Sequence, residues 1–201
     1  MQMGKYLIYT ALWLFPTTLM AQTIPNQNTF PNGVAPETPE VINYYETLPS
    51  LELTPQSLQK SLPTLVDNST QIYFRPLVDQ STYNSCVHAA TVVYTYTYEV
   101  NRIRNLPANS LVYFENHYPA HYTYNYVNGG ENGFSGMLDG WRIIQDCGIP
   151  TLPEWGDIFG DAIKWMTGYD KYLSALQNRV IMDIQQPFSV ASPEGLFKLK
   201  H

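Results

Sequence analysis

The chain has 201 residues, of which 44% are hydrophobic and 14% are charged, and its formal net charge is −6 at pH 7. This length and hydrophobic content suit one globular domain with additional segments. The acidic balance, with a pI near 5.1, excludes the basic surface that binding to nucleic acid or to an anionic membrane requires. The 16 tyrosines indicate either buried aromatic packing or an aromatic groove for peptide or glycan.

The first 21 residues have the pattern of a secretory signal peptide. Lys5 supplies the positive charge, residues 6–15 are mostly apolar, and Leu19-Met20-Ala21 offers a cleavage site. The apolar stretch is short for a bilayer span, and no other stretch is long enough. We therefore expect a secreted or periplasmic protein that is free of the membrane after signal cleavage. An N-terminus retained as an anchor is the alternative.

Residues 22–61 are rich in Pro, Thr, Asn and Gln, and six prolines are spread along them. Proline fixes φ and lacks the backbone N–H, so this spacing forbids long helices and interior strands. The segment is interpreted as a linker or an extended arm, with one or two helical turns within residues 51–62.

The stretch from Gln80 to Cys86 has the composition of an active-site loop. Residues 81–85 are polar and turn-forming, and no Pro or Gly interrupts the following segment to Leu106. A cysteine at the start of a helix lies near the positive end of the helix dipole, which favours the nucleophilic thiolate. A glutamine NH2 group donates hydrogen bonds and is able to face a developing oxyanion. The two residues together therefore predict a nucleophile and its oxyanion donor.

This stretch resembles the active-site region of the papain-like cysteine peptidases, whose pattern is Gln-x-x-Cys-Gly-Ser-Cys-Trp. The matching residues are Gln80, Ser85 and Cys86, and the pattern's first cysteine, its glycine and its tryptophan are replaced by Tyr83, Asn84 and Val87. Residues 62–67 (Leu-Pro-Thr-Leu-Val-Asp) are similar to the opening of many mature domains of the family. Residues 127–130 (Val-Asn-Gly-Gly) are similar to its Cys-Asn-Gly-Gly loop, and residues 136–150 to the helix after that loop.

The resemblance implies further roles for particular residues. Gly129 and Gly130, with Asn128 beside them, would hold the substrate main chain, since glycine lets a ligand backbone come close. An ordinary Asn-Gly turn is the alternative. The family's disulfide between the first cysteine of its pattern and its glycine loop has no counterpart here, because Tyr83 and Val127 occupy those positions.

The segment after Cys86 is ambiguous. Residues 91–98 are β-branched and aromatic, which locally favours a strand with Val92, Tyr94, Tyr96 and Tyr98 on one face. A helix instead places on one face Ala89, Val93, Tyr96, Val100 and Ile103. The resemblance implies a buried central helix that carries the nucleophile, so we predict a helix.

Cys86 and Cys147 are the two cysteines, and in an exported chain their default interpretation is a disulfide. The position of Cys86 before a helix, and of Cys147 at the end of another that Gly148 caps, favours free thiols instead. Trp141 and Trp155 are predicted to lie in the core.

His117 and His121 are four residues apart beside Glu115, but Pro119 between them argues against a metal site. We predict a polar surface turn with tyrosine packing there, with no metal and no cofactor.

The C-terminal part predicts two more helices. Apolar residues recur every four positions between Lys164 and Gln186, where Pro187 ends the pattern. Ser192 and Pro193 form a helix start. A papain-like peptidase also needs a histidine and an asparagine, which in this family follow the nucleophile by roughly 130–150 residues and so lie beyond His201.

His88 and the other histidines are not predicted to replace the missing base. The sequence therefore predicts an α+β papain-like fold with its helical first lobe in residues 62–201 and without its β-rich second lobe. The predicted function is that of an exported cysteine peptidase of peptide or protein substrates, present as a truncated fragment that is inactive alone. Residues 22–61 are the linker or, by resemblance, a short pro-segment. A non-catalytic exported binding protein is the alternative, and a second chain that supplies the missing lobe is a further one.

Overall fold

The computed structural model describes residues 34–59, 61, 64–80, 82–156, 164–180 and 185–200. Within these ranges the regular secondary structure is helical, joined by long loops, and the β contact is an isolated parallel bridge between Val34 and Ser135. The helical half of the α+β prediction is thus present, whereas the described residues form no strand. The predicted signal peptide lies outside the described residues, as do residues 62, 63 and 201.

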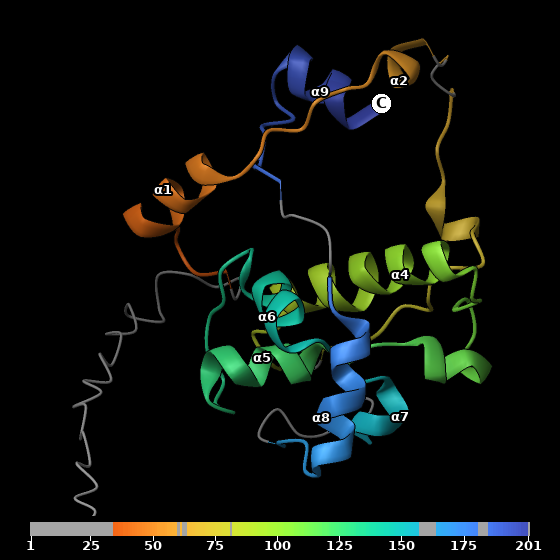
Figure 1. The fold of residues 1–201 in the computed structure, drawn as a ribbon, viewed down its shortest axis with the longest axis vertical. Helices are drawn as coiled ribbons and strands as arrows, with labels where there is room; N and C mark the ends of the chain where they lie inside the picture. The colour runs from red at the N-terminus through yellow and green to blue at the C-terminus, as the bar shows by residue number, and fades with distance from the viewer. Residues whose placement is uncertain are drawn as a thin grey trace, which may run out of the picture.

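A continuous helical segment runs through the middle of the bundle (Figure 1). It begins as α3 (Cys86–His88), continues as the π-helical η3 (Ala89–Tyr96) and ends as α4 (Thr97–Arg104). The helix prediction is confirmed, and the strand indicated by local propensity is wrong. The β-branched and aromatic side chains of η3 are accommodated because the segment is buried on several sides, and burial overrides propensity.

The π-helical turns change which residues face the core. The hydroxyls of Thr95 and Thr97 donate to carbonyls five residues back, those of Ala90 and Val92, at 2.9 and 3.2 Å. A π-turn contains more residues than an α-turn, so the face shifts along the sequence. Ile103, predicted on the buried face, is consequently 69% exposed.

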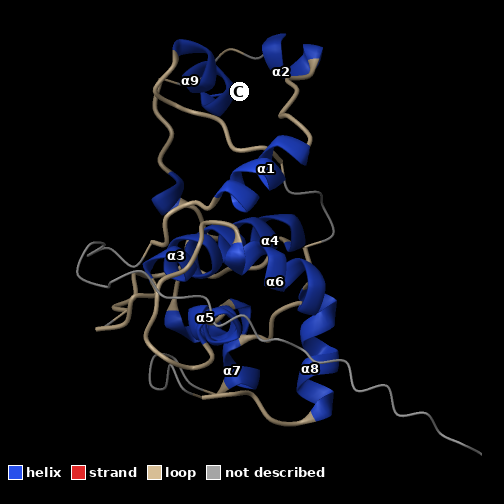
Figure 2. Ribbon diagram, turned by 90° about the vertical axis from the view of Figure 1, so that its left-hand side faces the viewer, coloured by secondary structure: helices blue, strands red, loops and turns tan. Residues whose placement is uncertain are grey.

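Further helices surround this central segment (Figures 1 and 2): α5 (Ala120–Asn128), α6 (Asp139–Cys147), α7 (Leu152–Trp155) and α8 (Tyr169–Ala175). Short 3-10 turns connect them, namely η2 (Asn68–Thr70), η4 (Leu111–Asn116) and η5 (Leu176–Asn178). The core between these elements is apolar and rich in aromatic rings: Val92, Tyr96, Tyr118, Tyr122, Ile144, Ile149, Trp155 and Met166. Four of these eight residues are tyrosine or tryptophan, which favours the buried-packing interpretation of the tyrosines. No helix in the described residues is long and apolar enough to cross a bilayer.

Helix α6 confirms the predicted helix at residues 139–147. Its close approach to the central helix depends on Gly140, where a Cβ atom would lie 3.1 Å from both Thr91 Oγ1 and Val92 Cγ2. The helix ends at Gly148, whose φ of 70° and backbone N–H bond to the Ile144 carbonyl form the predicted cap. Trp155 is buried as predicted, and Trp141 is half-buried and packs against the core.

Two predictions about local structure are wrong. The stretch around His117 and His121 is not a surface turn: both histidines are buried, and α5 begins directly after Pro119, which caps it. The helix expected between residues 164 and 186 is shorter than the stretch over which apolar residues recur. Its α-helical part ends at Ala175, because the Ala175 carbonyl accepts the Ile149 N–H and Asn178 Nδ2 donates to the Ile149 carbonyl.

The N-terminal arm is more helical than its prolines indicated. Thr38 caps α1 (Pro39–Thr47), and Pro39 occupies the first helical position, where proline is tolerated. The short α2 (Pro55–Gln59) confirms the helical turn expected there. The arm reaches the bundle at two points: the Ala35 N–H donates to the Ser135 carbonyl at 2.9 Å, and the Arg142 guanidinium lies 4.3 Å above the Tyr44 ring.

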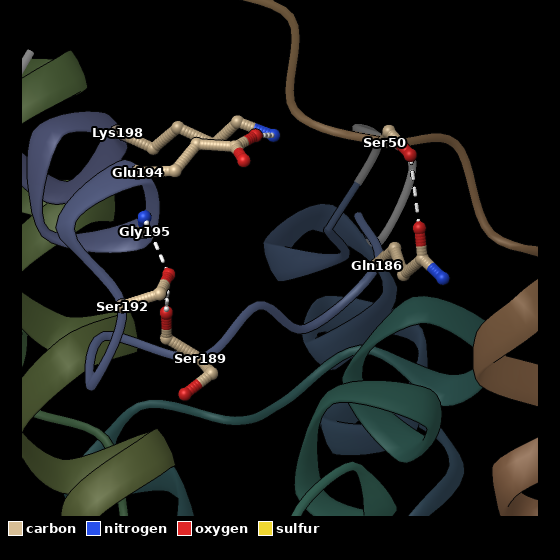
Figure 3. Close-up of polar contacts among 7 residues, drawn as sticks. All are labelled: Ser50, Gln186, Ser189, Ser192, Glu194, Gly195 and Lys198. Carbon is tan, nitrogen blue, oxygen red and sulfur yellow. Dashed lines mark hydrogen bonds and ion pairs between the residues drawn. The ribbon is translucent and has the colours of Figure 1, made fainter.

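Helix α9 (Pro193–Lys200) lies with α2 apart from the bundle (Figures 1 and 2). Figure 3 shows its first turn, where Ser192 Oγ accepts the Gly195 N–H at 3.0 Å, as the Ser-Pro start predicted. The segment that leads to α9 contacts the N-terminal arm, where Ser50 Oγ donates a hydrogen bond to Gln186 Oε1 at 2.9 Å.

Candidate functional site

The thiol of Cys86 stands at the start of the central helix. Cys86 is half-buried and is the first residue of α3, and the Ala89 N–H donates to the Ser85 carbonyl at 2.8 Å, which closes the first turn. Backbone N–H groups in a first helical turn lack intrahelical partners and point toward a ligand at that end. The predicted nucleophile therefore lies at the positive end of the helix dipole.

Gln80 lies on the same loop as Cys86 and is half-buried. Its Nε2 donates to the Tyr83 carbonyl at 2.9 Å, so the side chain spans the loop that precedes the nucleophile. An amide nitrogen carries two hydrogens, and this bond uses one of them. The glutamine thus holds the loop and keeps a second N–H for an acceptor.

Asn132 joins the nucleophile loop to the glycine loop, and the sequence analysis missed it. Its Oδ1 accepts the Asn84 N–H at 2.9 Å, and its Nδ2 lies 3.4 Å from the Thr82 carbonyl. The Tyr124 hydroxyl lies 2.9 Å from the same Oδ1 and accepts the Gly133 N–H at 2.9 Å. The bonded residues are up to 50 positions apart, so only the fold brings them together.

The glycine loop follows α5. Gly129 caps that helix with a φ of 63°, and Gly130 has a φ of 85°, so both occupy the left-handed region that favours glycine. Nothing lies within 4 Å of a Cβ built on Gly129, which leaves its backbone open to a ligand. The Asn128 amide instead turns inward, where Nδ2 lies 3.3 Å from both the Tyr124 carbonyl and Ser135 Oγ.

His88 is fully buried behind the loop and makes a specific internal contact. Its Nδ1 lies 2.8 Å from Thr123 Oγ1, and its Nε2 has no hydrogen-bond partner. Burial, with a smaller contribution from His121, lowers the pKa of His88 to about 3. A base of that strength does not take a thiol proton near neutral pH, in agreement with the expectation that His88 is not a general base.

His121, in the first turn of α5, lies beside the nucleophile loop. Its ring packs edge-on against Tyr83, with centroids 5.0 Å apart, and lies 5.8 Å from the Tyr124 ring. The predicted tyrosine packing is therefore present, although the histidine is buried. In the described part of the chain, no group of three or more His, Cys, Asp or Glu side chains is placed to hold a metal ion.

Both cysteines are free thiols, so the alternative of a disulfide between them is wrong. Cys147 is half-buried at the end of α6. Burial and, second to it, the nearby Asp146 raise the pKa of its thiol. The environment of Cys147 therefore disfavours a thiolate, and the two cysteines differ in the chemistry that their positions support.

Comparison with known proteins supports the fold. The structure matches the crystal structure of xylellain, a cysteine protease from Xylella fastidiosa, with a TM-score of 0.54 at 17% sequence identity. The match covers 74% of this chain and 55% of xylellain, so the chain spans about half the length of that protein. No family model and no curated protein matches the sequence. The chain therefore has a cysteine-protease-like fold in its helical part.

Proposed function

We propose that this chain is the nucleophile-bearing helical lobe of an exported papain-like cysteine peptidase. The observation that carries the proposal is the position of Cys86 at the open start of the central helix, on a loop that Gln80 and Asn132 hold. The cysteine-protease-like fold supports the same conclusion. The substrate class is peptide or protein, and no cofactor takes part in this chemistry.

The proposed reaction is acyl transfer to sulfur. The Cys86 thiolate attacks the carbonyl carbon of a peptide bond, and the resulting oxyanion accepts hydrogen bonds from Gln80 Nε2 and a backbone N–H. The C–N bond then breaks, the amine leaves with a proton, and water hydrolyses the thioester. The open backbone of Gly129 would hold the substrate main chain, whereas the predicted partner Gly130 is buried beside it.

The proton transfers need a histidine, and no histidine in the described part of the chain is assigned that role. We propose that this base and its orienting asparagine belong to the β-rich lobe of the fold, so that residues 1–201 alone turn over peptide poorly or not at all. The alternative of a non-catalytic binding protein depended on an aromatic surface. Within the described residues Tyr96, Tyr118 and Tyr122 pack in the core and are not available to such a surface.

Selective alkylation of the two thiols tests this proposal. The reduced protein would react with iodoacetamide from pH 4 to 9, with mass spectrometry reporting each cysteine and Cys86→Ser as the control. We expect Cys86 to react severalfold faster than Cys147 across this range, because Cys86 lies at the start of a helix and burial disfavours the thiolate of Cys147. Equal rates at both cysteines, or protection of Cys86 until the protein unfolds, would show that Cys86 is structural.

A further inference from the structure

A small cavity lies directly behind the nucleophile loop. Its volume is about 20 Å³, which is room for one body of the size of a water molecule or a halide ion. It lies between the loop before Cys86, the first half of η3, the start of α5 and α7, and its polar lining comes from Arg75, Gln80, Ser85 and His121. Among the described residues, no aspartate or glutamate lines it.

Arg75 brings an uncompensated positive charge to this cavity. The residue is only 3% exposed, its Nε has no hydrogen-bond partner, and its Nη1 makes one long contact of 3.5 Å to the Tyr118 carbonyl. In the described residues no carboxylate forms an ion pair with it. Burial lowers the pKa of Arg75 to about 10, so the guanidinium is still charged at neutral pH. A buried charge without a partner is costly, and natural sites pair it.

Ser85 supplies a second unsatisfied group. Its side chain is 1% exposed, its hydroxyl has no partner, and it does not cap the helix that follows it. The cavity therefore combines a guanidinium and a hydroxyl, both of which donate hydrogen bonds.

We propose that this cavity binds one small monovalent anion, for which chloride is the probe, between Arg75 and Ser85. A water molecule would bond to the two unpaired groups, Arg75 Nε and the Ser85 hydroxyl, but would leave the charge of Arg75 without compensation. Entry lies along the half-buried residues Val78, Gln80 and Ala120. The anion ties Arg75 to the residue immediately before Cys86 and so stabilises the loop from behind.

Chloride binding is measured directly by the excess line width of the ³⁵Cl resonance in the presence of protein. Thermal unfolding in chloride and in gluconate at equal ionic strength gives a second readout. We expect a saturable line-width excess that bromide displaces, and a melting temperature higher in chloride than in gluconate by several degrees, because a ligand that binds only the folded state stabilises it.

Three variants test whether chloride binds in this cavity. Arg75→Met should abolish the line-width excess, and Ser85→Ala should weaken chloride binding about tenfold, since one hydrogen bond to a charged group is lost. Arg142→Met is the matched control, because this exposed arginine lies over Tyr44 away from the cavity, and it should bind chloride normally. If Arg75→Met does not fold, Ser85→Ala decides. Equal melting temperatures in both salts without a line-width excess, or an unchanged excess in folded Ser85→Ala, would overturn the proposal in favour of a water-filled cavity.

Discussion

The buried imidazole of His88 predicts how the stability of this protein depends on pH. The Thr123 hydroxyl donates its proton to the Ala120 carbonyl at 3.1 Å, so it accepts a hydrogen bond from Nδ1–H of His88. Nε2 then carries the lone pair, and a proton added there would be buried without an acceptor. This geometry and the burial of the ring agree with a pKa lowered to about 3.

The size of the effect follows from proton linkage. In the unfolded chain His88 takes up a proton near its ordinary pKa of about 6.5, whereas the folded state stays neutral down to a pKa of about 3. The unfolded state therefore binds more protons throughout this window, and stability falls as pH falls through it. Between pH 7 and pH 5 the expected loss from this residue is about 2 kcal/mol.

Urea unfolding of the wild type and of His88→Gln at pH 7 and pH 5 measures this contribution. Glutamine does not titrate, and its NH2 group is able to donate to Thr123 in place of the ring. His117 and the carboxyl groups also change with pH, so the difference between the two proteins isolates His88. We expect the wild type to lose about 2 kcal/mol more than the variant over this interval. Equal losses in both proteins would refute the buried, neutral state of His88.

Three further substitutions test packing and the loop. Gly140→Ala places a Cβ 3.1 Å from two atoms of the central helix, and we expect overpacking to lower the free energy of unfolding by about 1–3 kcal/mol in urea titrations. Tyr96→Phe removes the hydroxyl that donates to the buried Asn178 carbonyl at 2.6 Å, at an expected loss of about 1–3 kcal/mol; an unchanged urea midpoint would contradict this. Asn132→Ala should slow the alkylation of Cys86 below pH 8 severalfold, because the loop loses the acceptor of its Asn84 N–H. Asn132→Asp keeps that acceptor but loses the amide donor that faces the Thr82 carbonyl, so its rate should lie between those of the wild type and Asn132→Ala; identical alkylation rates in wild type and Asn132→Ala would exclude a positioning role.

Much of the local structure near the nucleophile could be predicted from the sequence. The loop before Cys86 and the cap at Gly148 follow from short-range chemistry that a single sequence records, whereas the helix after Cys86 was predicted from the family resemblance against its local propensity. The exposure of Ile103 was not predictable in this way, since π-helical turns depend on tertiary burial and on threonine bonds within the helix. Apolar spacing likewise overestimated α8, whose end is fixed by contacts to Ile149.

The contacts within the candidate site were harder to predict from the sequence than the fold. Asn132 joins residues about 50 positions apart, and its signal in the sequence was no more than an Asn-Gly pair that resembles any turn. In the sequence nothing distinguishes Arg75 from a surface arginine. Only the structure shows that its side chain is buried without a carboxylate partner among the described residues. Both residues act through long-range contacts, which composition and periodicity do not report.

Attack of the Cys86 thiolate on a peptide carbonyl is the central claim, and a peptide aldehyde tests it most directly. An aldehyde labelled with ¹³C at its carbonyl forms a hemithioacetal with a reactive thiolate, and the shifted ¹³C resonance reports the adduct without any need for turnover. Cys86→Ser and Cys147→Ser identify the thiol that reacts. Gln80→Ala, with the exposed Gln71→Ala as its control, tests the oxyanion donor.

We predict a saturable adduct that Cys86→Ser abolishes and Cys147→Ser leaves intact. Gln80→Ala should weaken the adduct by about tenfold or more, because a hydrogen bond to the developing oxyanion is lost, whereas Gln71→Ala should not. The absence of any adduct at Cys86 in the folded, reduced protein, or an adduct confined to Cys147, would contradict the assignment of this chain as the nucleophile-bearing lobe of a cysteine peptidase.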